Sequence, residues 1–583
     1  MNGWWNRLAR VDLTESKVNY ESIGEQILKD FIGGRGLGAR LLVDEIVPDF
    51  DPLEDNVLIF ASGPLTGTSV PTSGRFSVSS KSPLTGTIAD SNVGGSIGKE
   101  FKRSGFDAMI IEGKAEEPVK LEIDDGDIEI IETDLWGEET GECLDKLDGE
   151  SAVIGPAGEN EVLYSSIVTD GFRVFGRGGM GAVMGSKNLK AVSVKGSKDV
   201  PVHDEELLKK HVKKAVSKIS SSPVTSRGLK KFGTPILVNL LTWLGMFSKK
   251  NFQEPAEENE AEEISGERMK DEIVEQHEGC YACPIRCGLK TETEEKKGKG
   301  PEYESVWALG SNIDNFELED VTELNYRCNE LGLDTISTGG TLACAMEMAE
   351  KGVWSKLEGF DEDAEELIEK IACEEGVGEE LARGSKRLCE KYGCDLSMTV
   401  KGMELPAYDP RGAAGQALSF ATSNRGGCHL RGYMIGEEIF GVPKLFDRFK
   451  TSGKSQLVKR SQERNAYIDS LIVCKFSAFA LDENFYSRFI QDVTGLEYTV
   501  SDLHRVGERI YNLEREFNVK AGFDRKDDHL PKRFHEPLEK GGSADNVFDI
   551  SSMLDEYYEM MGWNEEGKPR EEKLKELKIS GLL

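Results

Sequence analysis

The segment Cys280-Tyr-Ala-Cys283-Pro-Ile-Arg-Cys287 is the stretch around which we expect the rest of the fold to be organised, with the distant Cys474 as its partner. The C-x2-C-x3-C spacing brings three thiolates within reach of one metal centre. A four-iron four-sulfur cluster takes four cysteine ligands, and the fourth can come from anywhere in the fold. Structural zinc is a second interpretation, but it usually binds two close pairs of ligands, and the sequence has no second C-x2-C pair. Buried free thiols are the remaining alternative.

The length and charge of the chain limit the classes of protein to which it can belong. A chain of 583 residues is too long to fold around a single hydrophobic core, so we expect two to four domains. The net charge of −33 argues against nucleic-acid binding, because a phosphate backbone attracts clustered lysines and arginines. Eleven cysteines in a long chain do not resemble a secreted disulfide framework, and the first residues lack the apolar core of a signal peptide. We therefore expect a cytoplasmic protein.

The longest apolar stretch, residues 234–247, is shorter than a membrane span and contains Asn239. It predicts a buried helix, and no contact with a membrane is expected. The acidic run at residues 254–263 is interpreted as a solvated loop.

The periodicity of apolar residues changes along the chain. Up to about residue 202, short period-two runs such as 108–112, 119–123 and 128–131 are bounded by turn residues, which indicates strands. From about residue 204 onwards the spacing is mainly helical. The sequence therefore predicts an α+β fold with a β-rich domain at 1–205 and two helical domains at 206–405 and 406–583.

Glycines gather in the β-rich part, which suits a backbone that approaches a bulky or anionic group closely. The first cluster, Gly34-Arg-Gly36-Leu-Gly38, superficially resembles a dinucleotide-binding fingerprint. Residues 25–32 before it are spaced like a helix rather than the required strand, so a Rossmann domain is a minor alternative. Arg75 and Asn92 lie among other glycines and serines and could hold a phosphate. Ordinary turns are the simpler interpretation of these residues alone.

Two further segments carry candidates for proton transfer. Glu302 and Glu304 flank a tyrosine beside an apolar run, and a desolvated carboxylate there would have a raised pKa. His429 lies in a glycine-rich segment that suggests a loop at a site. A structural glutamate and a structural histidine are the commoner interpretations of such residues in isolation.

Together, these segments closely resemble the aldehyde:ferredoxin oxidoreductases, the tungsten-pterin enzymes, in motif, order and mutual distance. The resemblance extends from the N-terminus to about Arg525 and rests on 63–67, 74–76, 91–95, 176–191, the cysteine triplet, 302–304, 329–335 and 469–474. It implies a β-sheet saddle under a bis-pterin cofactor, with two helical domains closing over it. It also implies a single 4Fe-4S cluster bound by Cys280, Cys283, Cys287 and Cys474.

The resemblance assigns cofactor-binding residues in three groups. Positions that contact the pterin phosphates, or the Mg2+ that bridges them, match Arg75, Asn92, Gly94, Arg177 and Gly178. The two pterin-binding motifs match Asn329, Gly332, Asp334 and Thr335, and Asp469 and Val473, respectively. Both motifs depart from the family pattern, because Asn329 replaces an acid and Ile472-Val473 replaces Gly-Leu. Arg431 stands where the family often has lysine, which is not an equivalent donor.

By the same resemblance, Glu304 and His429 lie beside the tungsten (or molybdenum), with Glu302 a weaker candidate. The implied reaction oxidises an aldehyde to the carboxylic acid with water as the oxygen source. The cluster then passes electrons one at a time to ferredoxin. Glu304 would accept a proton, and His429 would polarise the aldehyde oxygen. The resemblance is compatible with a homodimer and with a complex that contains electron-transfer subunits. A shared iron site is not expected, because no histidine lies between His277 and His429.

Two alternatives to this function remain at this stage. The same cofactor could serve formaldehyde, glyceraldehyde 3-phosphate, an acid in the reductive direction or an aromatic-ring-reducing complex. Alternatively, the chain could be an electron-transfer subunit that keeps the cluster and lacks the tungsten site. Tungsten with about four irons per chain would support the enzyme, and iron alone would support the carrier.

Overall fold

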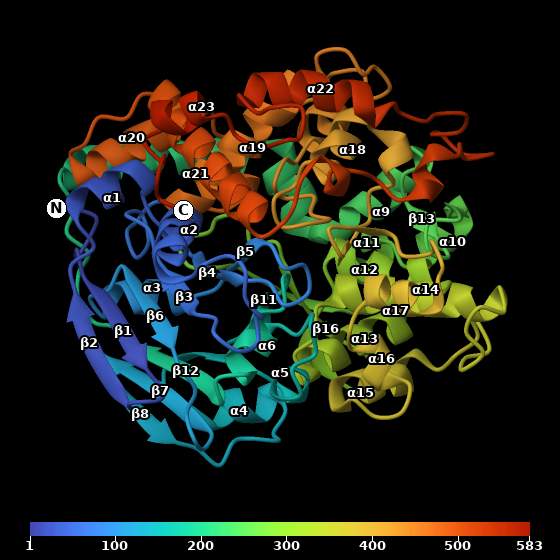
Figure 1. Ribbon diagram of the computed structural model, residues 1–583, viewed down its shortest axis with the longest axis horizontal. Coiled ribbons are helices and arrows are strands. Elements are labelled where there is room, and N and C mark those ends of the chain that lie inside the picture. Colours follow the sequence, from blue (N-terminus) through green and yellow to red (C-terminus); the bar gives the residue numbers. More distant parts are fainter.

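The computed structural model of the protein describes residues 1–583, and two six-stranded mixed sheets form its N-terminal part (Figure 1). The first sheet has the order β2-β1-β6-β3-β4-β5 and comprises β1 (Leu8–Asp12), β2 (Lys17–Glu21), β3 (Leu58–Ala61), β4 (Phe76–Lys81), β5 (Ile88–Val93) and β6 (Ala108–Glu112). The second has the order β11-β10-β9-β12-β7-β8 and comprises β7 (Val119–Asp124), β8 (Asp127–Glu132), β9 (Glu150–Val153), β10 (Ile167–Thr169), β11 (Arg173–Phe175) and β12 (Leu189–Lys195). The period-two runs therefore form the predicted strands.

One apolar core holds the two sheets together. It contains Phe60 and Phe76 from the first sheet and Phe175 from the second, all buried. The ring of Phe175 meets Phe60 edge-on at a centroid distance of 6.0 Å. Aromatic contacts of this kind add to the free energy gained by burying the rings themselves.

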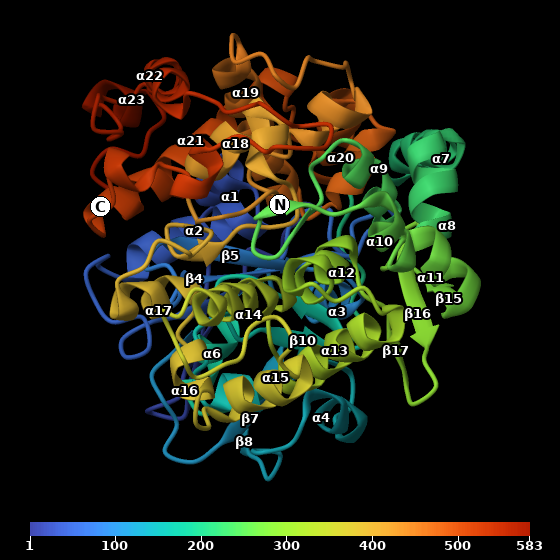
Figure 2. The ribbon, with the colours of Figure 1, turned by 90° about the vertical axis from the view of Figure 1, so that its right-hand side faces the viewer.

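The remainder of the chain is mainly helical and lies beside the sheets in two groups (Figures 1 and 2). After α7 (Glu205–Ser221), the first group contains α12 (Tyr303–Leu309), α13 (Leu318–Leu331), α14 (Thr335–Glu350), α15 (Ala364–Cys373), α16 (Gly378–Leu381) and α17 (Ser385–Tyr392). The second contains α18 (Ala414–Ala421), α19 (Lys454–Leu471), α20 (Glu483–Thr494), α21 (Val500–Lys520), α22 (Ile550–Met561) and α23 (Glu571–Glu576). The predicted α+β class is confirmed, while the domain boundaries at 205 and 405 stay predictions. No helix has both the length and the apolar character needed to cross a membrane.

The acidic run at 254–263 is not the loop that the sequence suggested, although most of its acidic side chains are exposed as expected. It contains β14 (Glu254–Pro255) and the helix α10 (Glu258–Glu263). The helix begins with a capping box, in which the Glu260 carboxylate accepts the Glu257 amide at 2.9 Å. Lys249 also pairs with Glu260 at 2.7 Å, so capping and pairing offset the repulsion between like charges. The apolar stretch before it forms the short α9 (Leu237–Trp243), which ends in an exposed Trp243.

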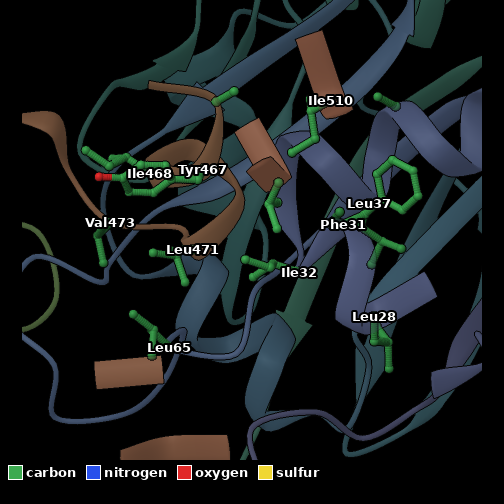
Figure 3. Packing of buried hydrophobic residues seen from close by; sticks show 14 of the residues in the cluster. Leu28, Phe31, Ile32, Leu37, Leu65, Tyr467, Ile468, Leu471, Val473 and Ile510 are labelled. Atoms are coloured by element: carbon green, nitrogen blue, oxygen red, sulfur yellow. The ribbon is translucent and has the colours of Figure 1, made fainter. Parts of the chain in front are cut away.

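The glycines at 34–38 allow two helices to pack closely. They lie in α2 (Gly34–Glu45), which follows α1 (Glu25–Phe31), so no strand precedes them as a dinucleotide site would require. Gly36 donates its amide to Ser470 Oγ at 3.0 Å. A Cβ on Gly34 would lie 2.4 Å from the Asp469 carbonyl oxygen. Figure 3 shows the surrounding core, to which Leu37 of α2 and Tyr467, Ile468 and Leu471 near the end of α19 all belong.

This close approach predicts a loss of stability in Gly34→Ala. The residue has φ +41°, which strains a side chain, and the new methyl group would also overlap the Asp469 carbonyl. Strain and overpacking each cost about 1–3 kcal/mol. We expect a lower midpoint of thermal unfolding, measured by circular dichroism. Gly24→Ala is the matched control, because Gly24 has φ +83° but no atom within 4 Å of the point that a Cβ would occupy. Equal losses in both variants would contradict the packing role of Gly34.

Candidate functional site

A cavity of about 920 Å³ lies where the three predicted domains meet. Its lining includes most of the residues that the sequence singled out: Arg75, Asn92, Gly94, Arg177, Cys280, Cys283, Cys287, Glu302, Glu304, Asn329, Asp334, Thr335, His429, Arg431, Asp469, Val473 and Cys474. Gly178 and Gly332 do not line it. The chain therefore brings distant segments together around one interior space large enough for a cofactor.

The backbone of Thr72 joins the cysteine triplet to Cys474. The triplet occupies the loop between β15 (Val274–Glu278) and β16 (Gly288–Glu292). Thr72 donates its amide to the Ala282 carbonyl at 3.0 Å, and its own carbonyl accepts the amide of Cys474 at 3.0 Å. Ala282 and Thr72 both have positive φ, so this junction is locally strained. Two hydrogen bonds of one residue thus hold the two sequence segments side by side.

The surroundings of the four cysteines fit a cationic cluster. Gly94 leaves room for Cys280, because a Cβ on Gly94 would lie 2.6 Å from its sulfur. Burial, followed by the charges of nearby cysteines, raises the pKa of Cys283 to about 11. Four neighbouring thiolates are therefore stable only with positive charge between them, which iron would supply. Among Cys280, Cys283, Cys287 and Cys474, no three sulfurs are grouped as ligands of one single ion. This arrangement differs from a compact zinc tetrahedron, whose sulfurs are about 3.8 Å apart.

Arginines line the cavity on both its sheet side and its helical side. Arg75 is half-buried directly before β4, and its Nη2 lies 3.6 Å from the Cys474 sulfur. Its Nη1 donates to the carbonyl oxygen of Asn92 at 3.4 Å. On the helical side, Arg425 and Arg431 are buried, and the Nε of each has no acceptor in the protein. Unpaired buried donors are costly, so these arginines favour an anionic group such as a phosphate.

Two carboxylates organise these cations. Arg431 Nη1 pairs with Asp90 Oδ1 at 2.8 Å, and Lys475 Nζ pairs with Asp469 Oδ2 at 2.9 Å. Although burial opposes it, the charges of Arg431, Arg35 and Arg425 lower the pKa of Asp90 to about 2. Sequence reasoning missed Asp90, Arg425 and Lys475. The only indication of these residues in the sequence was that they stand close to Asn92, His429 and Cys474, respectively, along the chain.

Arg177 supports the first predicted pterin motif. Its Nε donates to Asp334 Oδ2 at 3.1 Å, and its other nitrogens donate to the carbonyls of Gly427 at 2.9 Å and Glu404 at 2.7 Å. Asp334 is also the N-cap of α14, since its carboxylate accepts the Ile336 amide at 3.1 Å. Arg177 therefore fixes the start of α14 at the cavity wall.

The glycines of the predicted set act through backbone conformation. Gly332 ends α13 in the left-handed region at φ +77°, and a Cβ there would lie 2.9 Å from the Gly155 amide nitrogen. Gly178 also has positive φ, at +99°. Both conformations favour glycine, and both lie directly beside residues that line the cavity. In the second motif, Ile472 takes the left-handed conformation at φ +60° where the family has glycine.

Glu304 and His429 lie next to each other in the wall of the cavity. Glu304 lies in the first turn of α12, where its Oε2 accepts the Ala407 amide at 2.9 Å. Its Oε1 has no hydrogen-bond partner and lies 3.5 Å from His429 Nε2. Burial raises the pKa of Glu304 to about 8. Burial, followed by the charges of Arg177 and Arg425, lowers the pKa of His429 well below 6.5. At neutral pH the carboxyl is therefore largely protonated beside a neutral imidazole.

Glu302 has a different environment, although it also borders the cavity. Its Oε1 accepts from Lys299 Nζ at 2.7 Å, and its Oε2 accepts from the Thr234 hydroxyl at 2.6 Å. Both oxygens are thus paired. This contact fixes the entry into α12 and leaves Glu302 without a free acceptor for proton transfer.

Aromatic side chains form the wall next to His429. Tyr408 and Tyr433 lie 5.4 and 6.2 Å from the imidazole centroid, and Tyr433 continues to Phe479 at 6.4 Å. Phe440 meets Phe479 edge-on at 5.5 Å. No motif in the sequence indicated these aromatics, because they come from separate segments. Tyr408 and Tyr433 lie in loops, whereas Phe440 and Phe479 end two short helices, Gly436–Phe440 and Lys475–Phe479. They give the space beside Glu304 and His429 an apolar surface.

Comparisons with known proteins agree along the full length of the chain. Residues 8–196 match the family described as "Aldehyde ferredoxin oxidoreductase, N-terminal domain", and residues 210–579 match "Aldehyde ferredoxin oxidoreductase, domains 2 & 3". The chain is 47% identical to a tungsten-containing aldehyde ferredoxin oxidoreductase of Pyrococcus furiosus and 44% identical to one of Thermococcus kodakarensis. Each match covers 100% of both chains.

A solved structure, the active site complex BamBC of benzoyl coenzyme A reductase in complex with 1,5-dienoyl-CoA, shares the fold. It has a TM-score of 0.86 over 100% of this chain and 98% of that chain, at 24% identity. The two family models together match more than two thirds of the chain, and the relatives match it over its full length, so the protein belongs to the aldehyde ferredoxin oxidoreductase family.

Proposed function

We propose that the protein oxidises aldehydes to carboxylates, using a tungsten bis-pterin cofactor and one 4Fe-4S cluster, and passes the electrons to ferredoxin. The observation that carries this proposal is the unpaired Glu304 Oε1 facing His429 in the cavity that four cysteines also line. Full-length relatives with this activity in their names support it.

The residues at the cavity fit both groups. Cys280, Cys283, Cys287 and Cys474 would hold the cluster. The pterins and their phosphates, with a bridging Mg2+, would be held by Arg75, Asn92, Gly94, Arg177, Gly178, Asn329, Gly332, Asp334, Thr335, Arg431, Asp469 and Val473. When bound, the tungsten cofactor supplies the two-electron oxidation of the aldehyde carbon with water as oxygen source, and the cluster supplies one-electron transfer.

Glu304 and His429 would perform the proton chemistry of this oxidation. Conversion of an aldehyde and water to a carboxylate releases two electrons and three protons. The free Glu304 Oε1 is placed to accept a proton from water, and the neutral His429 is placed to hydrogen-bond the aldehyde oxygen. The Tyr408 and Tyr433 rings limit access of bulk water, which strengthens both interactions.

The proposed base role of Glu304 predicts a pH profile. Only the carboxylate form accepts a proton, and burial raises the pKa of Glu304 to about 8. We therefore expect kcat to rise with pH, about tenfold per unit below pH 8, and to level off above it. His429 stays neutral over this range, so no second inflection near 6.5 is expected. Stopped-flow measurement of aldehyde-dependent dye reduction from pH 6 to 9.5 tests this. A flat profile would rule out Glu304 as the base.

Metal analysis with an activity assay tests the proposed function itself. The full-length protein, produced anaerobically with tungstate, should contain tungsten and about four irons per chain, and should show aldehyde-dependent viologen reduction. Iron without tungsten, and no activity, would overturn the proposal in favour of an electron-transfer subunit. Activity with glyceraldehyde 3-phosphate and with no unphosphorylated aldehyde would replace the proposed substrate class by phosphorylated aldehydes. The aromatic wall of Tyr433, Phe440 and Phe479 favours unphosphorylated aldehydes instead.

A further inference from the structure

Three cysteines outside the cavity gather at one place in the first helical group. Cys344 lies in α14, Cys389 in α17, and Cys394 in the segment that follows α17. None of them lines the cavity or belongs to the four proposed cluster ligands. The remaining cysteine nearby in sequence, Cys373, is exposed and has no sulfur neighbour among them.

The sulfur of Cys389 contacts the sulfurs of both other cysteines. Cys344 Sγ lies 3.5 Å from Cys389 Sγ, and Cys389 Sγ lies 2.7 Å from Cys394 Sγ. The Cys394 amide donates to the Cys389 carbonyl at 3.0 Å, so the two backbones are held side by side. Cys344 and Cys389 are buried, whereas Cys394 is half-buried and reaches solvent. One thiol of the group is therefore accessible to a reagent that the other two cannot meet directly.

We propose that Cys389 and Cys394 form a reversible disulfide, which makes this cluster a thiol–disulfide exchange site on the enzyme. Their sulfur contact and paired backbones place them within reach of a bond without a large movement of the chain. This inference does not depend on the proposed oxidation of aldehydes.

The exchange requires a small-molecule or protein disulfide as oxidant. The half-buried Cys394 attacks one sulfur of that disulfide, which releases the first thiol and leaves a mixed disulfide. Cys389 then attacks the Cys394 sulfur and releases the second thiol. Two protein thiols are oxidised to one disulfide, and one external disulfide is reduced to two thiols.

The environment of Cys389 favours the second step. Contacts from Cys344 and then Cys394 lower the pKa of Cys389 to about 7, although burial opposes the shift. The thiolate is the nucleophile in exchange, so Cys389 is well suited to attack near neutral pH. Burial raises the pKa of Cys394 to about 12, so only a small fraction of this accessible thiol is thiolate near neutral pH, and the first attack is the slow step of the exchange.

The site lies on the elements that support Arg177. Cys344 and the N-cap Asp334 belong to α14, and Asp334 accepts from Arg177. At the start of α17, Ser385 donates to Glu404 Oε1 at 2.9 Å, and the carbonyl of Glu404 accepts from Arg177. The thiols therefore lie on α14, whose N-cap accepts from Arg177 directly, and on and after α17, which reaches Arg177 only through Glu404.

Peptide mapping of the anaerobic, full-length holoenzyme tests the proposal. The protein is equilibrated with mixtures of 2-hydroxyethyl disulfide and 2-mercaptoethanol, quenched with acid, alkylated and digested. We expect a Cys389–Cys394 linked peptide in oxidising mixtures that disappears in reducing ones, together with the loss of two alkylatable thiols per chain. A pair that stays fully alkylatable in every mixture would overturn the proposal.

Three variants separate this site from general thiol oxidation. Cys394→Ser should abolish the link, and Cys389 should then resist oxidation because it is buried. Cys344→Ser should leave the Cys389–Cys394 link in place. Cys373→Ser is the control and should change neither the link nor its midpoint. If Cys394→Ser formed a Cys344–Cys389 link under the same oxidising mixtures, Cys394 would not be the entry thiol.

Discussion

Glu304→Gln is expected to lower kcat by about 10²–10⁴-fold, the range that a positioned general base contributes. Glutamine keeps the size of the side chain and can still accept the Ala407 amide through its carbonyl oxygen. It cannot take up a proton at the position of Oε1, which faces His429 at 3.5 Å. The change therefore removes the proton acceptor and leaves the local fold in place.

The measurement combines turnover with metal content. Aldehyde-dependent viologen reduction should fall, while tungsten and iron per chain stay at the level of the unaltered protein. The pH profile is a second readout, since the inflection near pH 8 should vanish along with the carboxyl that causes it. Loss of the metals in this variant would instead assign Glu304 a structural role.

Glu302→Gln provides a matched control for this experiment. It is the same chemical change two residues earlier, at a carboxylate whose oxygens are both paired, with Lys299 and Thr234. We expect only a small change in kcat and no shift of the pH profile. A loss in Glu302→Gln as large as that in Glu304→Gln would show that any lost charge near α12 disables the enzyme.

The outline of the fold was predictable because the patterns that produce it are local. The apolar run at 108–112 forms β6 in full, and the helical spacing after residue 204 forms helices such as α23. The acidic run at 254–263 was misinterpreted because its charges were weighed without the contacts that offset them. The capping box of its helix lies within the run and was overlooked, whereas Lys249, which pairs with Glu260, comes from outside the run.

The candidate site was predictable only in part. Residues in recognisable motifs, such as Cys280 and Glu304, were identified in the sequence, and they line the cavity. Asp90, Tyr408 and Tyr433 were not, because an isolated aspartate or tyrosine has no signature until the fold gives it neighbours. The glycines at 34–38 suggested a ligand, yet they serve the packing of α2 against the end of α19. A close backbone approach and a phosphate site require the same residue, so sequence alone does not separate them.

Cys474→Ala is expected to remove the iron-sulfur cluster or reduce it to fewer than four irons per chain. The cluster takes four thiolate ligands, and no other cysteine lies beside Cys280, Cys283 and Cys287 along the cavity wall. The alanine amide can still donate to the Thr72 carbonyl, so the segment itself should stay in place. Iron analysis and electron paramagnetic resonance of the reduced protein measure the outcome.

Electron transfer to ferredoxin should fall with the cluster, by more than about 10²-fold if every electron leaves through it. Cys373→Ala is the control, because Cys373 is exposed and stands apart from the cavity. It should keep the full iron content and the full rate. If Cys474→Ala retained four irons with an unchanged resonance spectrum, the fourth ligand would have to be another group. In that case Cys474 would not complete the cluster. The hydrogen bonds of Thr72 to residues 282 and 474 would then only hold the cavity wall in shape.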